Sequence, residues 1–194
     1  MRDSPSFRPT GNPEADALLQ SNPLALLLGM LLDQQVPIEF AFAGPLRLAQ
    51  RMGDGFSVGH IASRDPEELL AYFLQRPAVH RYPAAMARRF HALCVALHDR
   101  YGEDPAQLWS EAKDATSLLD TVRSLPGFAE EKSRIFVAVL GKRFGVQPPG
   151  WVAACAPFGD DQPRTAADID SPTSQKRVKE WKAAQRAAGK SKAD

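Results

Sequence analysis

The stretch that most restricts the fold is residues 24–32, an apolar run in which Gly29 is the only interruption. Asn22 and Pro23 before it form a good helix start, because Asn caps helices and Pro is favoured at the first helical position. We expect a helix from Leu24 to about Gln35. A helix that is apolar on nearly every face must lie inside a protein, and nine residues are about half a membrane span. Its polar end must then be hydrogen-bonded inside the molecule or open onto a cleft.

A second constraint is the break between two helical patterns at residues 125–133. Pro126 and Gly127 interrupt apolar residues at helical spacing, which predicts a tight helical hairpin over residues 116–144. The first N–H groups of its second helix have no partner within that helix, and a helix N-terminus suits an anion. The Lys132 ammonium lies one turn further in. The pattern therefore predicts a phosphate-binding turn.

The other segments are helical patterns separated by Pro and Gly, with no strand-like alternation and no repeat, so the fold class is all-α. We expect a flexible arm over residues 1–12 and a helical domain over residues 13–188. The domain ends in a basic helix over residues 172–188. Residues 189–194 are expected to be a frayed tail.

Charge and cysteine content restrict the partners. The net charge is +1, but residues 176–194 hold seven Lys or Arg against two acids, so the rest of the chain is acidic. DNA contacts by the body would need local patches. Cys94, Cys155 and the four histidines show no metal-ligand spacing, and no signal peptide precedes the helices. We expect a cytoplasmic protein without a metal and without membrane contact.

The apolar helix ending in Gln-Gln, several amphipathic helices and a Leu-Pro-Gly hairpin occur in an order that resembles the helix-hairpin-helix DNA glycosylases of the endonuclease-III superfamily. The likeness covers roughly residues 18–146. Residues 31–36, Leu-Leu-Asp-Gln-Gln-Val, resemble the family's Leu-Leu-x-Gln-Gln-Thr. The resemblance implies a two-lobed helical fold. It also implies that Gln34 or, as we favour, Gln35 enters the DNA stack in place of a flipped base.

The hairpin matches the family pattern Leu-Pro-Gly-Val-Gly-x-x-x-Ala in part. Ala129 stands in place of the second Gly, and Ala costs more than Gly wherever φ must be positive, so a slightly altered hairpin or a looser phosphate grip is expected. Arg88 belongs to a basic segment between the two motifs. The DNA contacts that the resemblance implies in the hairpin are Gly127, Phe128, Ala129, Lys132 and Ser133.

The departures from the family concern its chemistry. Glu131 stands where bifunctional members carry a lysine nucleophile, and residues 145–154 lack the usual catalytic aspartate. The four-cysteine iron–sulfur loop is absent as well, so no cofactor is expected. The chain is more similar to uncharacterised helix-hairpin-helix proteins of actinobacterial type, which share its Asp-Gln-Gln-Val-Pro and Pro-Phe-Gly-Asp segments. That likeness carries no known reaction.

Breaking an N-glycosidic bond on a flipped nucleotide needs a carboxylate that stabilises positive charge on the sugar and orients water. Three substitutes are candidates: Asp33 at the end of the central helix, the Asp160–Asp161 pair in a later loop, and Glu131. Each also has a plain structural alternative. Asp33 could pair with Arg88, the Asp pair could form a solvated turn, and Glu131 could favour the helix N-terminus electrostatically.

These observations favour a monomeric DNA-binding protein of base-excision repair. Its partner would be double-stranded DNA with a damaged or flipped base. The first hypothesis is a monofunctional DNA glycosylase, which hydrolyses the N-glycosidic bond without a lyase step. The second is a non-catalytic binder of damaged or distorted DNA, and a third is a scaffold for protein contacts.

Overall fold

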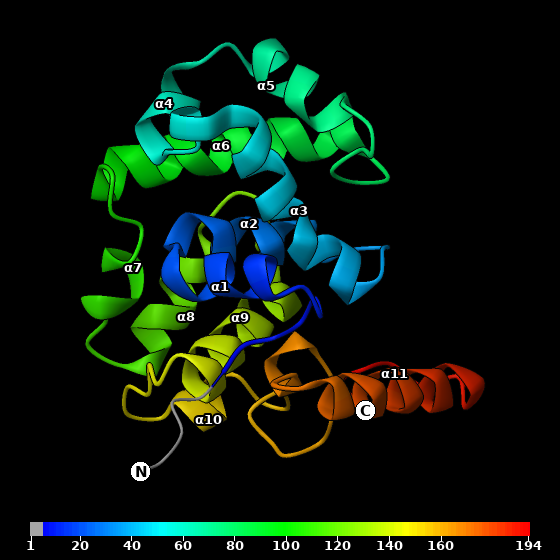
Figure 1. Ribbon diagram of the computed structural model, residues 1–194. Helices are drawn as coiled ribbons and strands as arrows, with labels where there is room; N and C mark the ends of the chain where they lie inside the picture. The colour runs from blue at the N-terminus through cyan, green and yellow to red at the C-terminus, as the bar shows by residue number, and fades with distance from the viewer. Residues whose placement is uncertain (1–5) are drawn as a thin grey trace.

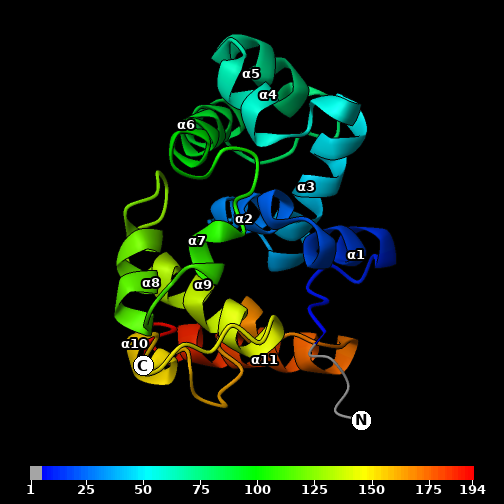
Figure 2. The same ribbon diagram turned by 90° about the vertical axis from the view of Figure 1, so that its left-hand side faces the viewer.

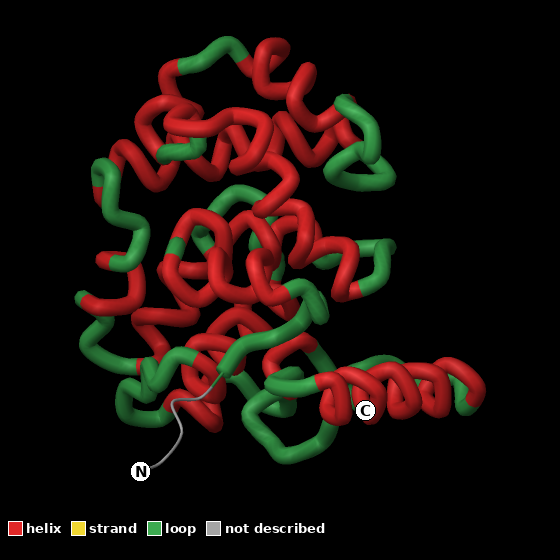
Figure 3. The backbone as a smooth tube through the Cα atoms, viewed as in Figure 1, coloured by secondary structure: helices red, strands yellow, loops and turns green. Residues whose placement is uncertain are grey.

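The computed structural model describes residues 6–194, and all regular structure in this part of the chain is helical (Figure 3). The all-α prediction is confirmed. The α-helices are α1 Pro13–Ser21, α2 Pro23–Leu32, α3 Ile38–Met52, α4 Val58–Ser63, α5 Pro66–Leu74, α6 Pro83–Tyr101, α7 Gln107–Ser110, α8 Ala115–Arg123, α9 Glu130–Arg143, α10 Trp151–Ala154 and α11 Pro172–Ala187. Two short 3-10 helices, η1 Gly53–Gly55 and η2 Ala166–Asp168, complete the set.

The helices are stacked in three groups along the long direction of the molecule (Figures 1 and 2). At one end α4 and α5 pack on α6, and at the other α9 packs against α8, α10 and η2. The helices α1, α2 and α3 pack on one another between these groups. The last helix, α11, lies beside the α9 group, and it contacts η2.

The helix α2 is the centre of the hydrophobic core. Every residue from Leu24 to Leu32 is buried, as the apolar run predicts. The Asn22 side chain accepts the Ala25 N–H at 3.0 Å, which confirms the predicted helix start. No single helix among residues 6–194 is long and apolar enough for a membrane span, although α1 and α2, which meet at 115°, together reach that length and composition.

The predicted flexible arm is corrected by the burial of Phe7, whose exposed fraction is 0 %. Its ring meets the Phe42 ring edge-on at 5.3 Å between centroids, and it lies 5.8 Å from the Phe144 ring. Burying an aromatic side chain contributes roughly 1.5–3 kcal/mol. Hydrogen bonds from the Ser6 hydroxyl to the Asp170 carbonyl at 3.2 Å and from the Arg8 N–H to the Ile169 carbonyl at 3.5 Å also hold the segment. Residues 1–5 of the predicted arm lie outside the described residues.

The predicted frayed tail over residues 189–194 also makes defined contacts. The Lys192 ammonium lies 2.8 Å from a Glu131 carboxylate oxygen, on the first turn of α9. The Lys192 carbonyl accepts a hydrogen bond from the Arg164 guanidinium at 3.1 Å. The end of the chain therefore folds back from α11 toward the start of α9.

The turn between α8 and α9 shows why Gly is needed at one position and not at the other. Gly127 has φ +86°, and a Cβ built on it would lie 2.3 Å from Leu31 Cδ1 on α2. Ala129 has φ −72° and ψ 171°, an extended conformation open to any residue. The expectation that Ala129 would distort the hairpin is therefore wrong, because this position does not have positive φ.

We expect Gly127→Ala to lower the free energy of unfolding by about 2–4 kcal/mol, because it adds backbone strain and a clash with Leu31. The matched control is Gly150→Ala, since Gly150 has φ +82° and no described atom lies within 4 Å of its added Cβ. The control should cost only about 1–2 kcal/mol. Equal losses in urea unfolding would show that the contact with Leu31 is not tight.

Candidate functional site

The turn that follows α2, residues 33–37, is where a buried helix end reaches the surface. The last four carbonyls of an α-helix have no partner within the helix, so a buried end needs donors from elsewhere. Here all four carbonyls accept hydrogen bonds. The bonds are Asp33 N–H to Gly29 O at 3.1 Å, Lys132 Nζ to Met30 O at 2.7 Å and to Leu31 O at 2.8 Å, and Gln34 N–H to Leu32 O at 2.7 Å.

Lys132 is therefore a structural donor to α2. Its side chain is mostly buried, and its ammonium points toward the end of α2. Burial lowers the pKa of Lys132 to about 8, against the attraction of the Asp33 carboxylate, which raises it. The ammonium was predicted to reach a phosphate at the hairpin. It instead donates hydrogen bonds to two carbonyls of α2.

The N-terminus of α9, where the sequence predicted an anion site, carries its own negative charges. Glu130 lies 2.8 Å from Arg123 and 2.7 Å from Arg134, measured between carboxylate oxygen and guanidinium nitrogen. The adjacent Glu131 pairs with Lys192. Acidic side chains satisfy the positive end of the helix dipole, and a phosphate approaching this turn would meet two carboxylates. The geometry thus disfavours the predicted phosphate grip.

Two other residues of the predicted DNA-binding hairpin have structural roles. Phe128 is 2 % exposed, and its ring packs edge-on against the Phe136 ring at 5.8 Å. The buried Ser133 hydroxyl donates to the Phe128 carbonyl at 3.2 Å and to the Ala129 carbonyl at 3.0 Å. Both side chains close the turn from inside, whereas Gly127 and Ala129 are exposed.

Gln34 is fixed by hydrogen bonds at both ends of its amide. Its Nε2 donates to the Leu31 carbonyl at 3.1 Å, and its Oε1 accepts from Arg89 Nη1 at 3.0 Å. The same Nε2 lies 3.5 Å from the Met86 sulfur. A side chain held in this way closes the helix end and is not free to enter a DNA stack.

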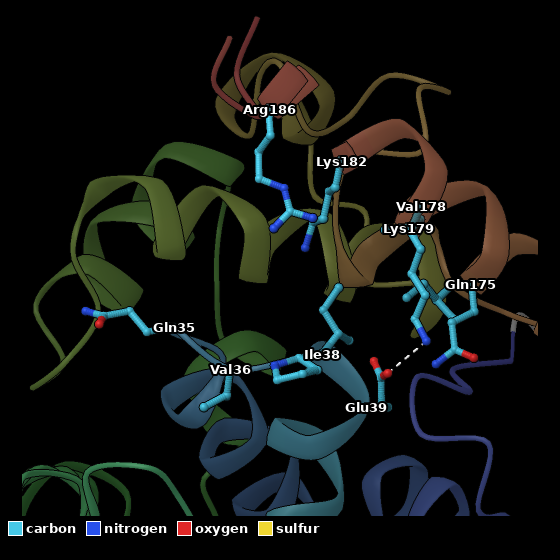
Figure 4. Close-up of a pocket in the computed structure, with 11 residues that line it drawn as sticks. Gln35, Val36, Ile38, Glu39, Gln175, Val178, Lys179, Lys182 and Arg186 are labelled. Atoms are coloured by element: carbon cyan, nitrogen blue, oxygen red, sulfur yellow. Dashed lines mark hydrogen bonds and ion pairs between the residues drawn. The ribbon is translucent and has the colours of Figure 1, made fainter. Parts of the chain in front are cut away.

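Gln35 is the exposed member of the pair. It has φ +56°, and it is the one non-glycine residue with positive φ in the described part of the chain. Its only side-chain hydrogen bond among residues 6–194 is a long one, in which Tyr82 Oη donates to Gln35 Oε1 at 3.4 Å. The side chain projects away from the pocket beside it (Figure 4). A left-handed backbone at a non-glycine residue costs about 1–2 kcal/mol, and such strain is concentrated at functional sites.

His80 is a buried side chain that hydrogen-bonds to the strained turn at residues 33–37. Its Nε2 lies 3.1 Å from the Gln34 carbonyl oxygen, and its Nδ1 lies 3.0 Å from the Tyr82 backbone nitrogen. Since Nδ1 accepts the Tyr82 N–H, the neutral ring carries its proton on Nε2 and donates to Gln34. Burial lowers the pKa of His80, which favours this neutral form. The turn and residues 80–82 are thus locked together.

Asp33 is the one candidate carboxylate that belongs to this turn. It is partly buried, and its negative charge raises the pKa values of Lys132 on α9 and Lys182 on α11. No ion pair or accepted hydrogen bond involves its carboxylate among residues 6–194. The predicted alternative, an ion pair with Arg88, is therefore not formed.

Asp160 and Asp161 lie elsewhere. Asp160 accepts from the Arg164 guanidinium, with 3.0 Å between its Oδ2 and Arg164 Nη2, and its carbonyl accepts from Lys142. Asp161 is exposed, and it borders a second pocket of about 510 Å³ between α9 and the start of α11. No residue of the 33–37 turn lines that pocket, so neither aspartate is placed with the glutamines.

The structure brings residues to the turn that the sequence reasoning did not select. Arg88 is exposed on α6, whereas its neighbour Arg89, about 100° further round the helix, reaches Gln34. His80 and Lys182 were also missed. A sequence signal existed for Arg89, as a basic residue on the same helix, but none existed for Lys182, which is 149 positions after Asp33.

A pocket of about 610 Å³ lies between this turn and α11 (Figure 4). Apolar and acidic side chains of residues 36–39 form one wall. Basic side chains of α11 form the opposite wall: Lys179, Lys182 and Arg186. Within residues 6–194, no three His, Cys, Asp or Glu side chains gather as a metal site.

Comparisons with models of protein families, with curated proteins and with solved structures gave no match to this chain.

We expect Lys132→Met to lower the free energy of unfolding by about 1–2 kcal/mol, because the Met30 and Leu31 carbonyls lose a strong donor. DNA affinity at matched salt should change less than about threefold. Urea unfolding and fluorescence anisotropy measure the two effects. A variant that keeps its stability but loses most of its DNA binding would contradict the structural role, and would restore Lys132 as a phosphate contact.

Proposed function

We propose that the chain is a DNA-binding protein of base-excision repair, with a two-lobed glycosylase-like fold in which α8, the 124–129 turn and α9 form the helix-hairpin-helix. Its partner is duplex DNA that contains a damaged or flipped base. The observation that carries the proposal is Gln35, an exposed residue on a left-handed backbone in a turn that the buried His80 holds through the Gln34 carbonyl.

An amide in this position suits the space that a flipped base leaves. Its flat, polar end can stack between the neighbouring bases and accept or donate hydrogen bonds to the unpaired partner. Flipping a nucleotide costs a few kcal/mol, so the side chain that fills the gap must already be in place. The His80 and Tyr82 contacts supply that rigidity. Arg89 and Lys182 supply positive charge near the turn for phosphates.

Within this function the first candidate activity is hydrolysis of the N-glycosidic bond, with Asp33 as the carboxylate. Asp33 directly precedes the Gln34–Gln35 pair, so it lies beside the nucleotide that Gln35 would displace. Its charge would stabilise the cationic sugar and orient the attacking water. No lyase step is proposed, because Glu131 pairs with Lys192 and the Lys132 amine donates to two carbonyls.

The second candidate is a binder of damaged or distorted DNA without base release. A specific observation favours it: the ammonium groups of Lys132 and Lys182 are close enough to Asp33 for their pKa values to respond to its charge. Positive charge on both sides of the carboxylate opposes the build-up of a cationic sugar. The same charges attract the phosphates around the lesion.

We expect Gln35→Ala to weaken binding to a duplex with an abasic-site analogue about tenfold, which is about 1.4 kcal/mol. Binding to the intact duplex should change little, because the stack is closed there. The control is Gln162→Ala, the same change in an exposed loop. Anisotropy titrations at fixed salt measure all six affinities, those of the wild type and of each variant for the two duplexes. Wild-type protein that binds both duplexes equally well, or neither of them, would contradict the proposed function.

We expect Asp33→Asn to lower the rate of base release at least about 100-fold, measured on a lesion duplex from which the wild-type protein releases a base. This is the usual contribution of a positioned acid or base. A panel of duplexes with deaminated, oxidised, alkylated and mispaired bases supplies the substrates. The exposed Asp161→Asn is the matched control, and its rate should equal that of the wild type. Release that Asp33→Asn leaves unchanged would exclude Asp33, whereas abasic binding without release from any duplex would establish the second candidate.

A further inference from the structure

We propose that α11 provides the DNA backbone contact, and that Lys182 and Arg186 together bind phosphate groups of the strand that passes the Gln35 turn. This inference depends on the proposed function and deepens it. It assigns the phosphate grip to the C-terminal helix, on the opposite side of the pocket from the turn, in place of the hairpin.

The first observation is the direction of the basic side chains. Lys179, Lys182 and Arg186 follow one another at intervals of three and four residues, so they share one face of α11. That face forms one wall of the pocket of about 610 Å³, and residues 35–39 form the other. Figure 4 shows the Lys182 and Arg186 head groups pointing into the same space.

The second observation is that these two cations have no counterion of their own. Lys179, one turn earlier, pairs with Glu39 at 2.8 Å between Nζ and Oε1. Within residues 6–194, no hydrogen-bond acceptor or ion-pair partner is in reach of the Lys182 ammonium or the Arg186 guanidinium. Burial lowers the pKa of Lys182, and the charges of Lys192 and Arg186 lower it further, while Asp33 and Glu39 act in the opposite direction.

The partly buried Lys182 and the exposed Arg186 repel each other, and an anion between them relieves that repulsion. The rise between Lys182 and Arg186 is about 6 Å, so both can contact a single phosphate or two that follow each other. Charge-assisted hydrogen bonds from Lys and Arg to phosphate are the strong ones, and Arg can bind two oxygens at once. The wall formed by Val36 and Ile38 is apolar, which suits a sugar.

An anionic membrane is the other partner that a basic helix can bind. A helix that lies on a membrane must bury an apolar face in the lipid. The apolar side of α11 is already used, because Val178 is 1 % exposed and belongs to the core. The basic face of α11 can therefore attract phosphates, but the helix has no free apolar side to insert into a membrane. A DNA strand is the partner that fits.

The test compares two double variants that remove the same charge from the same helix. Lys182→Gln with Arg186→Gln removes the two converging cations. Lys176→Gln with Arg177→Gln removes two exposed ones nearer the start of α11. Binding to the abasic-analogue duplex is measured from 50 to 300 mM KCl. Each lost phosphate contact should reduce the slope of log K against log salt by about 0.9.

We expect the Lys182 and Arg186 double variant to lose one to two contacts by this slope, and about tenfold or more in affinity at 100 mM salt. It should weaken binding to intact and abasic duplexes alike, since phosphates carry no lesion information. The Lys176 and Arg177 double variant should lose less than half as much. Circular dichroism melts confirm that both variants are folded.

The outcomes separate the two proposals. Equal losses in the two double variants, or wild-type affinity in both, would overturn the assignment to Lys182 and Arg186 and leave the DNA-binding function standing. A wild-type protein that binds no duplex at any salt would overturn both. So would binding to vesicles that contain anionic phosphatidylserine in preference to duplexes.

Discussion

The arrangement of the candidate site depends on one requirement, that the C-terminal carbonyls of a buried helix find hydrogen-bond donors. The helix α2 lies in the core, so water is not available to all of its last four carbonyls. An unsatisfied buried carbonyl costs about 1–3 kcal/mol. Lys132 meets this requirement from α9, and Gln34 meets it from within the turn. A lysine that performs this task cannot also serve as an exposed phosphate contact.

The same requirement explains why positive charge gathers around the turn. The C-terminal end of a helix carries about half a negative charge, and Asp33 adds a full one, so cations nearby are stabilised. Lys132, Arg89 and Lys182 come from three different helices and meet at this end. The carbonyls and Asp33 neutralise part of this charge, whereas Arg186 lies on the opposite wall of the pocket without an ion-pair partner among residues 6–194. The structural need of α2 thus produces a local electropositive surface beside Gln35.

The sequence predicted the elements better than it predicted the site. The start of α2 at Asn22 and its buried state follow from a cap and from apolar composition, which are local properties. The role of Lys132 does not, because its direction depends on how α9 packs on α2, a contact between residues about 100 positions apart. The expectation for Ala129 came from a family pattern with Gly at this position. The backbone φ of Ala129 is −72°, which any residue can adopt and which the sequence does not show. Arg88 and Arg89 have the same chemistry, and they differ only in the direction in which each points from the axis of α6.

Positive charge is concentrated at the C-terminal end of the chain, in residues 176–194. Residues 1–175 are acidic as a whole, so the body repels DNA at long range, and the first turn of α9 adds Glu130 and Glu131 to that repulsion. Attraction must then come from residues 176–194, where most of the positive charge lies. That segment is useful for recognition only if it is fixed near Gln35, the residue that we propose enters the DNA stack. Because Val178 anchors α11 in the core and Lys179 pairs with Glu39, the basic face is held opposite the Gln35 turn. A DNA strand drawn to α11 would therefore arrive at the one side chain that is positioned to test it.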